Sequence, residues 1–235
     1  MYRNILHTSA TCLVAIVFTA SPLRAQDHDE SNAVEGGGIS VDGWNGQIDS
    51  QEAARGSALE NAKLSEENGV FHVTTGPAVV YWKTGNETSG NYTVMATFDE
   101  PEYRTLSNHP HPYGIFIGGN DMGTEEQSLL YCAAYGSGKF IVRGFGPDAF
   151  QMNGRRGEEN DVINKAADVG EPVSQTIALT VSDDKVECSI NGTVVASYSK
   201  SDLIGEGKLK STDGVYGFRF GHNTAGTVTG FHSTN

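Results

Sequence analysis

The sequence predicts an all-β protein, a sandwich of two antiparallel sheets. Short segments of alternating apolar and polar residues recur along the chain, and turn residues separate them. Asn191-Gly192 lies between two such segments and is typical of a hairpin turn, because both turn positions need positive φ. The sequence shows no internal repeat and no alternation of strands with helices, so it favours a two-sheet sandwich over a repeat fold or an α/β fold.

The N-terminus reads as an export signal followed by a short leader. Residues 1–25 combine a positive Arg3, an apolar run and a small residue, Ala25, suited to cleavage, and the apolar run is too short to span a bilayer. Residues 26–42 are acidic and then glycine-rich, so a disordered lead-in is expected there. The domain itself is predicted over 43–235, in a secreted or periplasmic protein.

The elements follow in order. Residues 44–48 are a candidate edge strand, and residues 49–54 a candidate helical turn with an Asp or Ser cap. The remaining predicted strands cover residues 70–74, 78–83, 91–98, 113–118, 128–135, 139–145, 175–182, 185–191, 193–198, 215–221 and 227–231. Residues 146–174 form one long connection with room for a short helix over 158–167; a functional loop and a floppy insertion both remain open.

The hairpin over residues 128–145 has two unlike faces. Its apolar face, directed to the core, consists of Leu130, Cys132, Ala134, Phe140 and Val142. The opposite face carries Tyr131, Tyr135 and Arg143, and the turn pairs Tyr131 with Arg143 across the strands. Tyrosines and an arginine are unlike an ordinary solvated surface, so this face is a candidate binding face.

Neighbouring strands extend that face with Phe116 and Arg219, both flanked by glycines. Glycine in a strand marks a close approach by a ligand or by another part of the backbone. One interpretation is therefore a shallow sugar-binding floor beside stacking and donor side chains, with Tyr131, Tyr135, Arg143, Arg219 and Phe116 as ligand-binding residues. The other is that the glycines mark bulges and the tyrosines pack under residues 146–174.

Charge and cysteines limit the partners. The chain has 16 Lys+Arg and 29 Asp+Glu; without residues 1–25, which hold Arg3 and Arg24, 14 remain against 29, a formal −15. Nucleic acid and anionic membranes are therefore not expected partners. Cys132 and Cys188 both lie on core-facing positions, where either a disulfide or two buried free thiols would fit.

Other motifs are weaker. His109 and His111 sit in an extended segment and point the same way, but the sequence offers no third ligand and the prolines around His111 suit a stiff loop. Residues 120–126 are rich in oxygen ligands without the spacing of a known calcium loop. No metal and no cofactor are therefore expected. No strand carries the paired carboxylates of a retaining glycosidase.

The C-terminal third resembles a known group. Lys185 to Val195 resembles the strand, Asn-Gly turn and return strand of concanavalin A-like jelly rolls, and Asp213 to His222 with Val228 to Phe231 resembles their closing strands. Together these segments are similar to the 3-keto-disaccharide hydrolase-like domains of exported bacterial proteins, and more distantly to laminin G-like domains. The resemblance implies two curved antiparallel sheets with a concave, sugar-accepting face. The segment Gly217 to Gly221 departs from the family pattern, so only His222 is carried over, as a candidate catalytic residue.

Three functions follow as hypotheses. The first is a non-catalytic exported protein that binds carbohydrate or a glycoside on the concave face. The second, implied by the resemblance, is a hydrolase or lyase acting on 3-keto-glycosides, with His222 as its base. The third is a structural or adhesion module that binds protein. The oligomeric state is not predicted.

Overall fold

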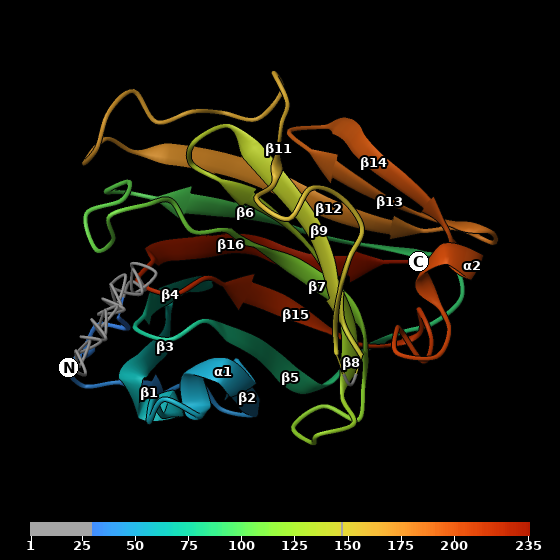
Figure 1. Ribbon diagram of the computed structural model, residues 1–235, viewed down its shortest axis with the longest axis horizontal. Coiled ribbons are helices and arrows are strands. Elements are labelled where there is room, and N and C mark those ends of the chain that lie inside the picture. The colour runs from blue at the N-terminus through green and yellow to red at the C-terminus, as the bar shows by residue number, and fades with distance from the viewer. Residues whose placement is uncertain (1–29, 147) are drawn as a thin grey trace, which may run out of the picture.

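The computed structural model describes residues 30–146 and 148–235, so the predicted signal segment lies outside the described residues. Two sheets face each other, and the predicted all-β sandwich is confirmed (Figure 1). The short helices lie at its ends, α1 (Ser50–Ala53) beside β2 and α2 (Lys200–Leu203) near the C-terminus. A 3₁₀ turn, η1 (Leu59–Asn61), precedes β3. Within the described ranges no helix is long and apolar enough to cross a bilayer.

The first sheet contains the first and the last strand of the described chain. Adjacent strands in this sheet are antiparallel, except at one edge, where β1 runs parallel to β3. In spatial order it consists of β1 (Gly38–Ile39), β3 (Ala62–Glu67), β4 (Val70–Thr75), β16 (Ala225–Thr234), β6 (Tyr92–Glu100), β12 (Val173–Val181), β13 (Lys185–Ile190) and β14 (Thr193–Ser199).

The second sheet carries the candidate binding face and is antiparallel. In spatial order it consists of β10 (Ala149–Gln151), β9 (Lys139–Phe145), β8 (Ser128–Tyr135), β7 (Tyr113–Asn120), β15 (Gly214–Phe220), β5 (Val79–Thr88) and β2 (Trp44–Ile48), with β11 (Glu158–Glu159) added to β9.

Alternation decides which side chains enter the core. The predicted core face of the β8–β9 hairpin is fully buried between the sheets, together with Phe218 and Phe220 of β15. The predicted pairing of Tyr131 with Arg143 is also confirmed. The Asn191-Gly192 turn joins β13 and β14 with φ of 51° and 81°, as the hairpin signal requires.

A disulfide joins the two sheets. Cys132 of β8 and Cys188 of β13 are bonded, with their Cα atoms 6.1 Å apart, and each is at most 1 % exposed. Of the two alternatives for these cysteines, the bridge is therefore the correct one.

The other face of the second sheet is more enclosed than expected. Phe116, Tyr131 and Ile141 are at most 3 % exposed and belong to a second hydrophobic cluster. A Cβ on Gly217 would lie 2.1 Å from the Tyr81 carbonyl oxygen and 2.5 Å from the Phe116 ring. The protein's own atoms thus occupy the space over this glycine, and it forms no open floor for a ligand.

Two expectations about irregular segments differ from the structure. A helix over 158–167 is wrong, since Glu158–Glu159 pairs with β9 and the rest is irregular. The described part of the 26–42 segment is ordered onto the domain: Asn32 N donates to Asn223 Oδ1 at 2.7 Å, and β1 pairs with β3. Hydrogen bonds to distant residues hold this segment, and its polar composition gives no local sign of them.

Candidate functional site

A cavity of about 270 Å³ opens where the second sheet meets α1 and the loop before β7. Four arginines line it, Arg55, Arg143, Arg155 and Arg219, and we call it the arginine cavity. Tyr131, Tyr135 and His222 line it as well. The predicted site residues from β8, β9 and β15 thus converge on one concavity. Phe116 does not line it, because its side chain is wholly buried in the second hydrophobic cluster.

Arg219 forms the floor of this cavity. Its guanidinium makes two parallel hydrogen bonds to the Asp49 carboxylate, at 2.7 and 2.6 Å, and lies 4.9 Å from the Tyr131 ring centroid. Its side chain is only 6 % exposed. Burial disfavours its charge, but the Asp49 carboxylate outweighs that cost and raises the pKa of Arg219. The ion pair also borders a second cavity, of about 420 Å³, on its other side.

Arg143 and Tyr135 lie nearer the opening and are half-buried. The Arg143 guanidinium lies 5.4 Å from the Phe145 ring centroid, a cation–π arrangement that fixes its plane. Its Nε is buried with no hydrogen bond among the described residues. Burial, with Tyr131 nearby, raises the pKa of Tyr135 to about 12 although Arg143 and Arg219 oppose the shift, so its hydroxyl stays protonated at neutral pH.

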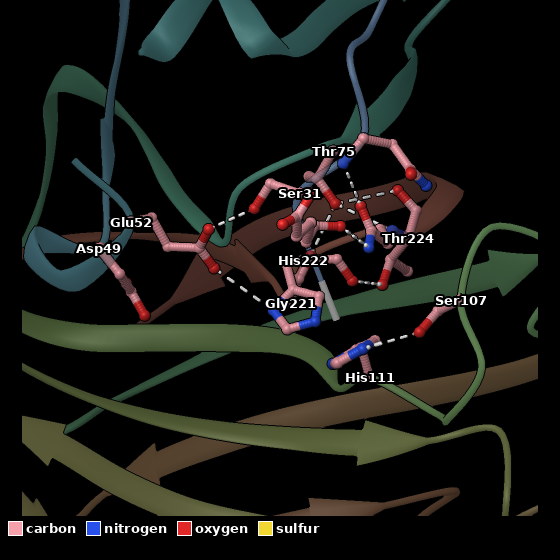
Figure 2. Close-up of polar contacts among 12 residues, drawn as sticks. Ser31, Asp49, Glu52, Thr75, Ser107, His111, Gly221, His222 and Thr224 are labelled. Carbon is pink, nitrogen blue, oxygen red and sulfur yellow. Dashed lines mark hydrogen bonds and ion pairs between the residues drawn. The ribbon is translucent and has the colours of Figure 1, made fainter. Parts of the chain in front are cut away.

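His222 follows β15 after Gly221 and is held by Glu52 of α1. Its Nδ1 lies 3.3 Å from Glu52 Oε1, and the Ser31 hydroxyl donates to the other carboxylate oxygen (Figure 2). Burial raises the pKa of Glu52, but the contacts from His222 and Ser31 outweigh it and lower that pKa to about 2. Glu52 is therefore an ionised, buried carboxylate that orients the imidazole of His222.

The loop before β7 brings two further histidines to His222. The ring centroid of His111 lies 3.7 Å from that of His222, and the centroid of His109 lies 4.4 Å from that of His111. Figure 2 shows the His111 ring between His222 and Ser107, whose hydroxyl lies 3.0 Å from His111 Nε2.

Some residues of this cavity were predicted from the sequence, and others were not. Tyr131, Tyr135, Arg143 and Arg219 were identified from their strand positions, and His222 from the resemblance to the 3-keto-disaccharide hydrolase-like group. Asp49, Glu52 and Arg155 were missed, since each reaches the cavity from a helical turn or a loop. Only the placement of Asp49 and Glu52 on a predicted helical turn offered a signal, and it gave no partner for either.

The chain resembles solved structures only distantly. No family model matches it, and no curated protein matches it. A protein of unknown function with a galectin-like fold from Bacillus subtilis is 13% identical, with 81% of this chain and 88% of that chain covered and a TM-score of 0.52. This likeness shows the fold, a galectin-like jelly roll.

Two further structures are more distant. The carbohydrate-binding module CBM66 from Bacillus subtilis is 9% identical, with 85% of this chain and 99% of that one covered, at a TM-score of 0.44. Sheep galectin-11 in complex with glycerol is 10% identical, with 72% of this chain and 100% of that one covered, at a TM-score of 0.42. Membership of the 3-keto-disaccharide hydrolase-like group stays a prediction.

Proposed function

We propose that the protein is an exported, non-catalytic carbohydrate-binding jelly roll whose ligand occupies the arginine cavity. The observation that carries this proposal is a single concavity in which the half-buried Tyr135 and Arg143 lie beside the buried Tyr131 and the Arg219–Asp49 ion pair. Tyrosine rings and hydroxyls with guanidinium donors are groups that recognise the faces and hydroxyls of a sugar. The buried Cys132–Cys188 disulfide supports an oxidising, extracytoplasmic location.

The charge of the cavity narrows the ligand class. Its lining includes Arg55, Arg143, Arg155 and Arg219 but only two carboxylates, Asp49 and Glu52. The whole chain has a formal net charge of −13, so this excess of guanidinium groups is local. Guanidinium binds carboxylates in a bidentate geometry. The cavity therefore favours saccharides that carry acidic groups, such as uronic acids.

A glycan array that includes neutral and acidic saccharides tests this function. The informative variant is Arg143→Gln with Arg155→Gln, because both side chains reach the opening and neither is in the core. We expect binding to weaken at least ~10-fold, since each charged hydrogen bond contributes roughly 1.5–3 kcal/mol. The matched control is Lys63→Gln with Lys83→Gln, which removes the same charge from exposed positions. Equal binding by both double variants would remove the proposal.

A second candidate function rests on the His222–Glu52 contact. A carboxylate on Nδ1 orients the imidazole and leaves Nε2 to accept a proton, the arrangement of a general base. A 3-keto group acidifies the neighbouring C–H bonds of a sugar, so a single base in this cavity would suit a hydrolase or lyase of 3-keto-glycosides. We expect His222→Gln to lower such turnover by ~10²–10⁴-fold. Incubation with 3-keto-glucosides is the assay, His72→Gln is the control, and absence of any product from the native protein removes this candidate.

A further inference from the structure

We propose that His109, His111 and His222 together bind one divalent transition-metal ion. One possible ligand atom from each imidazole lies within 4.8 Å of the other two. In a tetrahedral zinc site, nitrogens about 2.0–2.1 Å from the metal are about 3.4 Å from one another. Ligation requires the side chains to rotate, because the His111 and His222 ring centroids lie 3.7 Å apart and two rings that share one tetrahedral ion stand farther apart. His109 has the most freedom to turn, since it is exposed.

Contacts around the rings orient them as ligands. Glu52 lies against Nδ1 of His222, which favours the tautomer with its lone pair on Nε2. Ser107 lies against Nε2 of His111, which favours ligation through Nδ1. A carboxylate behind a ligating histidine is a recurrent feature of protein metal sites, because it fixes the ring and raises its basicity.

The backbone holds the histidines together before any ion arrives. Gly221 N donates to the Pro112 carbonyl at 2.7 Å, which ties the end of β15 to the loop that carries His111. A Cβ on Gly221 would lie 2.8 Å from the Cβ of His111, so only glycine permits this approach. Pro110 and Pro112 restrict φ on either side of His111. The three rings thus meet on a stiff framework.

The ligand set indicates the class of metal. Three imidazoles without a thiolate suit Zn²⁺, Co²⁺, Ni²⁺ or Cu²⁺, whereas Ca²⁺ and Mg²⁺ prefer oxygen. Three protein ligands leave a coordination position for water or a ligand. His111 and His222 line the arginine cavity, and His111 also lines the neighbouring cavity with His109, so this position would be reached from both.

The metal site gives His222 a different role from that of a general base. An imidazole that ligates through Nε2 cannot accept a proton there. The bound ion would instead supply a Lewis acid beside the guanidinium groups of the cavity. Metal binding does not depend on the proposed carbohydrate function, and the test below contains no sugar, so either proposal can fail without the other.

Titration of the metal-stripped protein with Co²⁺, followed by calorimetry and by the visible absorption of Co²⁺, tests the site. We expect one ion per chain and a visible absorption spectrum typical of Co²⁺ with a low coordination number. His109→Ala should abolish that spectrum, and because this side chain is exposed the variant should fold normally. Glu52→Gln should weaken binding ~10–100-fold, as expected for a residue that orients a ligand. Zn²⁺ should displace Co²⁺.

His72→Ala and His232→Ala are the controls, since both side chains are exposed on the first sheet, on β4 and β16. They should bind Co²⁺ as the native protein does. Binding that survives His109→Ala combined with His222→Ala, or that falls equally in the control variants, would mean an adventitious ion only and would overturn the proposal. So would the absence of binding by the native protein.

Discussion

Arg219 illustrates how burial separates a structural role from a binding role. It was expected to contact ligand, yet both of its terminal nitrogens donate to Asp49 and its side chain is 6 % exposed. Asp49 also stands at the N-cap of α1, where its side chain makes no capping bond. The carboxylate holds the guanidinium instead, so the ion pair fastens α1 to β15 and shapes both adjoining cavities.

Asp49→Asn should therefore destabilise the fold. Removing the carboxylate leaves the buried Arg219 charge uncompensated, which costs about 3–5 kcal/mol in comparable buried pairs. Urea unfolding followed by tryptophan fluorescence measures the change in free energy of unfolding. Glu187→Gln is the matched control, because its ion pair with Lys185 lies at the surface, where solvent screens it, and should contribute far less. Equal losses in the two variants would contradict a structural role for Asp49.

Glu100 should make stability depend on pH. Burial raises its pKa to about 7, against a smaller opposing contribution from the backbone N–H of Arg104, which donates to Glu100 Oε1. Because the folded-state pKa exceeds the ordinary value of 4.5, the folded protein binds more protons between these two pH values. Stability from this group is complete below pH 4.5 and is lost as pH rises through 7.

The Glu100→Gln variant isolates this contribution. At about 1.4 kcal/mol per pKa unit, the free energy of unfolding of the native protein should fall by up to about 3 kcal/mol relative to the variant between pH 4.5 and 8. Urea unfolding at the two pH values measures it. Glu67→Gln, at an exposed position, should retain the native pH profile. A Glu100→Gln profile identical to the native one would show that Glu100 does not titrate in this range.

At the scale of strands, local alternation predicted far more than the connections did. The faces of β8 and β9 were predicted correctly because successive side chains of a strand point to opposite faces. Once one residue is assigned to the core, the faces of all the others follow. The residues that cover the outer face could not be predicted from the strands themselves. Asp49, Glu52 and Arg155 reach this face from segments outside β8 and β9. The proximity of His222 to His111 was missed for the same reason, since the two rings meet only because β15 pairs with β7.

The junction between β15 and the loop before β7 depends on Gly221. Gly221→Ala would place a Cβ 2.8 Å from the Cβ of His111 and force the two segments apart. We expect a loss of about 1–3 kcal/mol in the free energy of unfolding, typical of overpacking, together with weaker Co²⁺ binding. Gly205→Ala is the control, since a Cβ there meets nothing within 4 Å. If Gly221→Ala matched the control in both measurements, the close approach would not constrain the histidines.

For the molecule as a whole, the disulfide connects the two sheets, from β8 of the second to β13 of the first. Cys132 and Cys188 are 56 residues apart in sequence, and closing a loop of that length in the unfolded chain contributes about 4 kcal/mol to stability. Cys132→Ala with Cys188→Ala should lower the free energy of unfolding by about that amount, as urea unfolding would show. Both sulfurs are buried, so dithiothreitol should reduce the native protein only once urea unfolds it. An unchanged midpoint in the double variant would show that packing between the sheets suffices, and rapid reduction without urea would show that the sandwich opens under native conditions.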